Sequence, residues 1–320
     1  MTGPRVGVVG ARRARQGLGP FVVRDLRAAG AEVPCILATR AETRDAAVRA
    51  LATHTGVEPR GYLDLDEMLA RESLDALAIL SPAPCHAEPL AAAARARLHV
   101  LCEKPFVWGV PDLAARTRAL VEAIEANGRV LFENCQWPYA LPAFARLHPG
   151  ACDTPPRRFE MELQPASRGL QSLADAMPHP LSLLQALAPS REARVEDVWF
   201  STRDAQRLQQ TVRFRYCAGQ RTVEVEVQLA STQVTPRRAS LALDGRRARR
   251  VVSPEDYRLS FADANHTVPL DDPLTRLVAD FVAAVREAPQ QRPRTRGQEI
   301  VQRMQLLADI VDAYADGGTQ

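Results

Sequence analysis

The sequence contains almost no lysine. Lysine and arginine together number 41, and Lys104 is the only lysine among them. Arginine cannot release a proton near neutral pH, whereas a lysine removed from water can. A single lysine could survive by chance in a chain so biased toward arginine. The residues around Lys104, described below, favour a chemical role instead.

Several other features are also missing. No run approaches the roughly 20 apolar residues that cross a bilayer, and the net charge is only +3 without a long block of one sign. Neither membrane insertion nor nucleic-acid binding is therefore predicted. The six cysteines are scattered without a CxxC pair, which predicts reduced thiols rather than a disulfide or metal framework. Arg12 and Arg13 are adjacent, but no apolar export segment follows them, so we expect a cytoplasmic protein.

The first part of the chain alternates short apolar runs with helical patterns. The strand-like runs cover residues 5–10, 33–39, 75–81, 99–105 and 129–134. Helical patterns cover residues 21–29, 41–53, 86–96 and 111–127, and a loop with a short helix, capped by Asp64, covers residues 62–72. Near-continuous apolar strands between helices predict an α/β domain over residues 1–134, a Rossmann fold with a doubly wound parallel sheet.

After residue 135 the apolar residues mostly alternate with polar ones. Strand-like segments begin near residues 159, 195, 210, 221 and 238, with one helix at 173–187 and a terminal helix pair at 274–287 and 296–315. This pattern predicts an α+β domain over residues 135–320 with a mainly antiparallel open sheet. The terminal helices could instead pack on the first domain. We expect the open face to expose apolar side chains and to form a homodimer or homotetramer.

A glycine-rich turn follows the first strand. Rossmann domains carry GxGxxG there, because glycines permit a tight turn and a close approach to pyrophosphate. Here the segment reads GARRARQGLGP, and Gly10 and Gly19 can serve as its first and last glycines. The loop between them is longer than the motif and contains Arg12 and Arg13, which could clamp phosphate or remain solvated.

The end of the second strand indicates which cofactor is bound. An NAD-binding domain usually has an acidic residue there for the ribose 2′-hydroxyl. This chain has Thr39 and Arg40 instead, so nothing repels a 2′-phosphate and a cation is available to bind one. The sequence therefore favours NADP over NAD, although Arg40 could also be a surface charge.

Residues 74–106 carry a family resemblance. They read LDALAILSPAPCHAEPLAAAARARLHVLCEKPF. The spacing of Ser81–Pro82, His86 and Glu103–Lys104–Pro105 resembles that of the glucose–fructose oxidoreductase and inositol dehydrogenase family, as do residues 272–285. The resemblance implies a nicotinamide-dependent oxidoreductase whose cofactor lies near Ser81, Pro82, His86, Glu103 and Lys104. We also expect the Lys104–Pro105 bond to be cis, since proline makes that form accessible.

The family's second motif is an aspartate followed four residues later by a histidine, here Asp175 and His179. The resemblance implies that both act with Lys104 as the acid–base group beside the nicotinamide. Oxidising an alcohol needs a base and reducing a carbonyl needs an acid, and histidine and buried lysine suit both tasks. Met177 and Ser182 stand where the family has glycine and aspartate, which fits a smaller or less polar substrate than a standard sugar.

Two alternatives remain open from the sequence. One is an imine or thiazoline reductase of specialised metabolism in the same superfamily. The other is an NADP-binding sensor or partner protein that has lost turnover. The altered glycine loop favours the sensor, whereas retention of the only lysine at position 104 opposes it.

Overall fold

The computed structural model describes residues 3–11, 18–202, 208–287 and 295–316. The chain divides into two compact units. The first unit combines Met1–Asn134 with Leu274–Val301, and the second combines Cys135–Pro273 with Gln302–Gln320. The division passes through the last helix, α10 (Thr295–Asp316).

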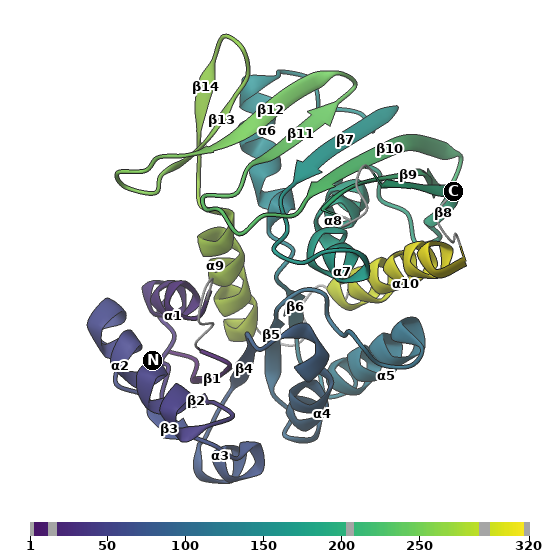
Figure 1. The fold of residues 1–320 in the computed structure, drawn as a ribbon. Helices are drawn as coiled ribbons and strands as arrows, with labels where there is room; N and C mark the ends of the chain where they lie inside the picture. Colours follow the sequence, from purple (N-terminus) through teal and green to yellow (C-terminus); the bar gives the residue numbers. More distant parts are fainter. Residues whose placement is uncertain (1–2, 12–17, 203–207, 288–294, 317–320) are drawn as a thin grey trace. The chain divides into compact units, whose positions relative to one another are not determined.

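The first unit contains a six-stranded parallel sheet (Figure 1). Its strands are β1 (Val6–Val9), β2 (Cys35–Leu37), β3 (Arg60–Tyr62), β4 (Ala76–Ile79), β5 (His99–Cys102) and β6 (Leu131–Glu133). Their order is β3-β2-β1-β4-β5-β6, the Rossmann order, so the predicted doubly wound sheet is confirmed. Strands β1, β4 and β5 are buried throughout, as expected when helices cover both faces.

Helices connect these strands. They are α1 (Gly19–Ala28), α2 (Ala41–Thr55), α3 (Leu65–Arg71), α4 (Ala87–Arg95) and α5 (Leu113–Glu125), with a short 3-10 turn, η1 (Ala83–Cys85), before α4. The predicted cap is present, because the Asp64 carboxylate accepts a hydrogen bond from the Glu67 amide at 2.7 Å. Helix α9 (Pro273–Arg286) also belongs to this unit, where Phe281 contacts Phe132 edge to face.

The second unit contains an eight-stranded sheet. Its strands are β7 (Arg158–Leu163), β8 (Arg194–Thr202), β9 (Gln209–Ala218), β10 (Arg221–Ala230), β11 (Ala239–Leu243), β12 (Arg246–Val252), β13 (Leu259–Ala262) and β14 (Thr267–Leu270). The order is β14-β13-β12-β11-β7-β10-β9-β8, and every neighbouring pair is antiparallel except β7 and β10. The predicted mainly antiparallel sheet is confirmed, but its strands β12–β14 were not predicted. Strand β3 of the first sheet was not predicted either.

The helices of the second unit also differ from the prediction. Two helices, α7 (Leu170–Ala176) and α8 (Pro178–Leu187), replace the one expected at 173–187. They separate at Met177, because Pro178 has no amide hydrogen to continue the helical pattern. A 3-10 turn, η2 (Trp137–Ala140), and helix α6 (Leu141–Leu147) were not predicted.

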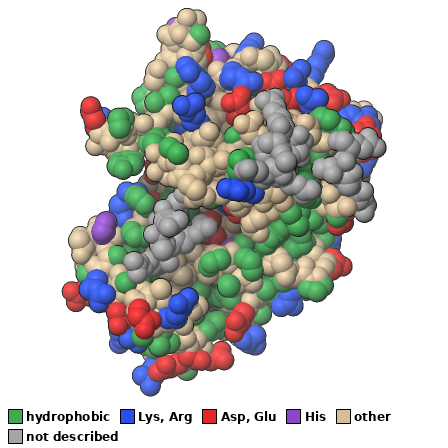
Figure 2. Space-filling view, in the orientation of Figure 1, with side chains coloured by type: hydrophobic (Ala, Val, Ile, Leu, Met, Phe, Trp, Pro, Cys, Tyr) green, Lys and Arg blue, Asp and Glu red, His purple; other side chains and the backbone are tan. Residues whose placement is uncertain are grey.

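The open face of this second sheet is charged rather than apolar. Alternate residues of β10, such as Val225 and Val227, are buried against the helices, whereas Glu224 and Glu226 lie on the other face. Ion pairs join neighbouring strands there, including Arg213 to Glu226 at 2.8 Å. Positive and negative side chains are interspersed over this unit in Figure 2. Trp199 and Val251 are exposed on this face, as expected, whereas neighbouring outward positions of β9 and β10 carry paired charges. Self-association through this face stays a prediction.

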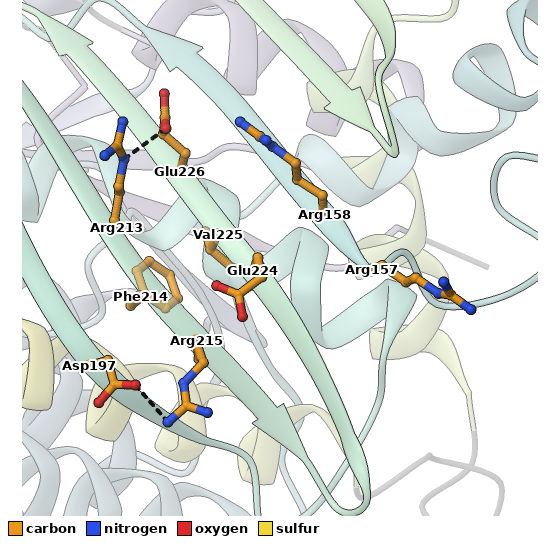
Figure 3. Close-up of a pocket in the computed structure, with 9 residues that line it drawn as sticks. All are labelled: Arg157, Arg158, Asp197, Arg213, Phe214, Arg215, Glu224, Val225 and Glu226. Atoms are coloured by element: carbon orange, nitrogen blue, oxygen red, sulfur yellow. Dashed lines mark hydrogen bonds and ion pairs between the residues drawn. The ribbon is translucent and has the colours of Figure 1, made fainter.

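A hollow of about 660 Å³ lies on the sheet near β9 and β10. Figure 3 shows its charged side chains, with Arg213 bound to Glu226 and Arg215 bound to Asp197. These partners neutralise one another, and exposed ion pairs contribute little to stability. No residue predicted for the catalytic or cofactor site lines this hollow.

No helix in the described ranges has the length and apolar character needed to cross a membrane. Within the same ranges, no cluster of three or more His, Cys, Asp and Glu side chains is arranged to hold a metal ion.

Candidate active site

Gly10 and Gly19 occupy positions that no larger residue fits. Gly10 follows β1 with φ +80°, and a Cβ atom there would lie 2.7 Å from the backbone of Ser81. Gly19 opens α1, and its Cβ would lie 1.7 Å from the carbonyl oxygen of Ala11. The turn after β1 thus lies against the turn after β4, and α1 begins directly against the chain leaving β1. Both are the close approaches that a dinucleotide-binding turn requires.

The turn after β1 contains two of the predicted phosphate-binding residues. Arg12 and Arg13 lie outside the described residues. Thr39 and Arg40 are exposed and follow β2, where Arg40 is the N-cap residue of α2. The Arg40 carbonyl accepts a hydrogen bond from the Thr43 hydroxyl at 2.8 Å. The first residues after β2 therefore present a cation and no carboxylate, as the sequence indicated.

His86 connects two turns at the carboxyl edge of the sheet. Its buried ring lies with Nε2 2.8 Å from the Ser81 carbonyl oxygen and Nδ1 3.0 Å from the Pro105 carbonyl oxygen. A neutral imidazole donates from one of these nitrogens and an imidazolium from both. Either way, His86 holds the Ser81–Pro82 turn after β4 beside the turn after β5, which makes it a positioning residue rather than a proton carrier.

The Ser81 hydroxyl provides a test of whether a polar ligand fits here. Its oxygen is enclosed and has no hydrogen-bond partner among the described residues. A buried hydroxyl without a partner is uncommon, because leaving it unsatisfied costs about 1–3 kcal/mol. It lies next to Gly10, at the point where the strand order reverses between β1 and β4. Ligands of open α/β sheets bind at this point, so the residues present fit a dinucleotide.

Lys104 lies just beyond the carboxyl end of β5. Its side chain is half-buried, and the Lys104–Pro105 bond is cis, as expected. The preceding residue, Glu103, is buried and accepts a hydrogen bond from the Asn134 side chain. Glu103 therefore helps to hold the ends of β5 and β6 together and fixes the chain from which Lys104 projects. Burial, followed by the charges of two nearby glutamates, raises the pKa of the Cys102 thiol well above its ordinary value, so that thiol is unreactive.

Asp175 and His179 lie on consecutive helices of the second unit. Asp175 is in the last turn of α7 and accepts a hydrogen bond from the Ser167 hydroxyl. His179 is in the first turn of α8, half-buried, with its ring centre 6.3 Å from that of Trp137. The break at Met177 separates them, so the pair spans a helix junction rather than one helical face.

Ser182 shows what replaces the expected aspartate. Its buried hydroxyl donates to the His179 carbonyl oxygen at 2.7 Å. A hydroxyl that is bound to its own helix offers no carboxylate to a substrate.

An aromatic group near His179 was missed by the sequence analysis. The Trp137 ring stacks with Phe261 at 6.4 Å between centroids, and the guanidinium of Arg250 lies over the indole at 5.6 Å. Trp137 follows β6 by four residues, and a departure from the family's Asn-x-Arg pattern at Asn134–Trp137 was its only signal in the sequence. Nothing in the sequence pointed to Phe261 or Arg250.

Comparisons with known proteins report what each part of the chain is similar to. Residues 4–135 match the oxidoreductase family with an NAD-binding Rossmann fold, GFO_IDH_MocA. The match confirms the expected family resemblance over these residues.

Curated relatives match over part of the chain. D-apiose dehydrogenase of Paraburkholderia graminis is 36% identical over 129 residues, which is 39% of this chain and 32% of that protein. An NADP-dependent scyllo-inositol 2-dehydrogenase of Bacillus subtilis is 37% identical over 86 residues, 27% of this chain and 25% of that protein. The matches thus span a third or less of these relatives.

Solved structures match over nearly the whole chain. UDP-N-acetylglucosamine 3-dehydrogenase of Acidithiobacillus ferrooxidans has a TM-score of 0.68 at 20% identity, covering 98% of this chain and 99% of that one. A 3-ketoreductase of Actinomadura kijaniata in complex with NADP has a TM-score of 0.69 at 19% identity, covering 96% of each chain. At this identity the likeness shows that the two-unit fold is shared.

Proposed function

We propose that the chain is a nicotinamide-dependent dehydrogenase or reductase that prefers NADP and acts on a small alcohol or carbonyl compound. The observation that carries the proposal is the carboxyl edge of the first sheet. Gly10 and Gly19 form a close-packed turn at the strand-order switch, and Lys104 follows β5 at that same edge. Phosphate binding and proton transfer then share the edge where such sheets hold ligands.

A nicotinamide dinucleotide bound at this edge would supply or accept the hydride. Gly10 and Gly19 let the backbone approach its pyrophosphate, and Ser81 offers a hydroxyl that no described residue occupies. The cation at Arg40 favours a 2′-phosphate over a free 2′-hydroxyl. His86 keeps the turns after β4 and β5 in register.

Lys104 is the proposed proton carrier. In the oxidation of an alcohol it would take the hydroxyl proton, and in the reverse direction it would return that proton to the carbonyl oxygen. Asp175 and His179 are proposed to assist, with the histidine exchanging the proton and the carboxylate holding a substrate hydroxyl. Relatives named as dehydrogenases or reductases of apiose, inositol and anhydrofructose support a sugar or polyol substrate.

Substituting Lys104 tests the proposal. Lys104→Met should leave NADPH binding nearly unchanged and lower turnover by about a hundredfold or more, the usual scale for one acid–base group. Lys104→Arg should fail almost as badly, because arginine keeps the charge without exchanging the proton. The control is Arg95→Met, which removes an exposed cation from α4. NADPH binding is followed by its fluorescence, and turnover by its absorbance with a panel of sugars, polyols and imines. Near-native turnover by Lys104→Arg would refute the role of Lys104.

The same assays separate two other functions. Position 182 offers a sugar hydroxyl no carboxylate, because it is a serine whose own hydroxyl is bound to the His179 carbonyl oxygen, which favours imine reduction as a second candidate. Turnover with imines but not with sugars would select it. NADPH binding without turnover on any member of the panel would select a sensor.

A further inference from the structure

Arg250 is a cation on the covered face of the second sheet. It lies in β12, where register pairs it with Phe261 on one side and Ala239 on the other, both buried. It therefore points to the same side as Ala248, toward the helices. A charged side chain at such a position normally has an acidic partner, because the uncompensated cost is several kcal/mol.

Arg250 has no acidic partner among the described residues. Its Nη2 donates to the Arg237 carbonyl oxygen at 2.9 Å, and its guanidinium lies over the Trp137 ring. Its Nε is enclosed and donates to no described atom. Burial, and secondly the positive charge of Arg237, lowers the pKa of Arg250 below its ordinary value. The positive charges of Arg250 and Arg237 are therefore close enough to interact.

Arg247, on the same strand, shows the ordinary arrangement. It lies on the open face and binds Glu160 at 2.6 Å and Glu162 at 2.7 Å. The strand thus gives two acids to the arginine on the open face and, within the described residues, none to the arginine on the covered face. The guanidinium of Arg250, which has no acidic partner among the described residues, has donors that suit an anion.

Trp137 links Arg250 to the proposed active site. The indole contacts both the guanidinium of Arg250 and the ring of His179. All three residues lie in the second unit. Arg250 and His179 thus lie beside the same indole ring.

We propose that Arg250 binds an anionic group of the substrate, a carboxylate or a phosphate, while the reacting carbon lies toward His179. This inference rests on the proposed function, since it takes His179 as part of the active site. Arginine suits the task because its planar donors match both anions in two-point contact. The substrate class then narrows to sugar acids, sugar phosphates and related anionic polyols.

The test compares matched ligands on the full chain, both without NADPH and with NADPH at saturating concentration. D-glucuronate and D-glucose 6-phosphate are titrated against D-glucose by calorimetry, and inorganic phosphate is included as a free anion. At least one charged sugar should bind about tenfold or more tightly than glucose, the scale of a hydrogen bond to a charged group. Arg250→Met and Arg250→Gln should lose that preference. Arg249→Met is the control, because Arg249 is exposed on the opposite face of the same strand.

Thermal unfolding without ligand provides a second readout. Removing an uncompensated buried cation should leave the melting temperature of Arg250→Met unchanged or raised, whereas loss of a purely structural arginine would lower it. Equal binding of charged and neutral sugars by the wild type would overturn the proposal. So would a preference that persists in both Arg250 variants, or binding of inorganic phosphate alone.

Failure of the proposed function is read separately. NADPH fluorescence reports cofactor binding, and turnover reports chemistry, whereas the anion preference is measured by binding alone. A chain that prefers anionic sugars through Arg250 but binds no nicotinamide cofactor would refute the proposed function and leave Arg250 as an anion site.

Discussion

Replacing Gly19 with alanine sets two physical effects against each other. Alanine in the first turn of α1 should stabilise the helix by up to about 1 kcal/mol, because glycine is the poorer helix former. The structure predicts the opposite sign, because the new Cβ would lie 1.7 Å from the Ala11 carbonyl oxygen and 2.5 Å from its carbonyl carbon. Both neighbours are backbone atoms, so relief requires α1 to move away from the chain after β1.

The expected magnitude follows from that displacement. A Cβ atom and a backbone oxygen need at least about 3 Å, so the helix start must shift by more than 1 Å. Overpacking of this kind costs about 1–3 kcal/mol, which exceeds the helical gain. The Gly19→Ala variant should therefore unfold at lower urea concentration. It should also bind NADPH more than about tenfold less tightly, since the shift moves the turn that approaches the pyrophosphate.

Urea unfolding and NADPH fluorescence titration measure the two effects. Gly56→Ala is the matched control, because Gly56 ends α2 with φ +67° and nothing lies within 4 Å of a new Cβ. It should lose about 1 kcal/mol through backbone strain while keeping NADPH affinity. A stabilised Gly19→Ala variant with unchanged affinity would show that α1 does not begin against the β1 turn and that no dinucleotide cradle exists there.

Two further predictions concern charge. The wild type should bind NADPH at least about tenfold more tightly than NADH, and Arg40→Glu should reverse that preference, as measured by calorimetry; unchanged selectivity would exclude Arg40 as the determinant. Burial alone would raise the pKa of Glu72, but hydrogen bonds from Arg60 and Tyr62 at 2.7–2.8 Å outweigh it, so the pKa lies below its ordinary value. The resulting stabilisation is complete above the pKa that Glu72 has in the unfolded chain. It is lost as pH falls through the lower pKa that Glu72 has in the folded chain. Glu72→Gln should therefore lower the free energy of unfolding by about 1–2 kcal/mol at pH 7, a loss that is limited because Arg60 is mostly exposed. Urea unfolding should show that this loss shrinks below about pH 4. Exposed Glu67→Gln is its control, and a deficit that does not depend on pH would contradict the reasoning.

The first sheet was predictable because its signals are local. Apolar runs such as residues 75–81 can be recognised as buried strands without knowledge of a distant partner. The Asp64 cap likewise depends on four consecutive residues, because Asp64 accepts from the Glu67 amide. Strand β12 was missed for the opposite reason. Its sequence, RRARRVV, shows no apolar face that would indicate a strand. The partners that accommodate Arg247 in the sheet, Glu160 and Glu162, lie more than 80 residues earlier in the sequence.

The candidate site divides in the same way. Gly10, Gly19 and Lys104 were predictable from motifs that lie next to strand ends. The Arg250–Trp137 contact was not, because it joins residues more than 100 positions apart and depends on the register of β12 with β13. The prediction of a single helix over residues 173–187 was wrong at Met177. It gave more weight to the pattern of apolar residues than to the proline that follows Met177.

Strand β7 has a consequence for how the second unit folds. Strands β8–β10 pair with their sequence neighbours, and so do β11–β14. Neither group can join the other until β7, which precedes both in the sequence, inserts between β10 and β11. Such non-local pairing slows folding. Until β7 inserts, each group exposes an unpaired edge where chains aggregate, so the yield of refolded protein should fall steeply with concentration.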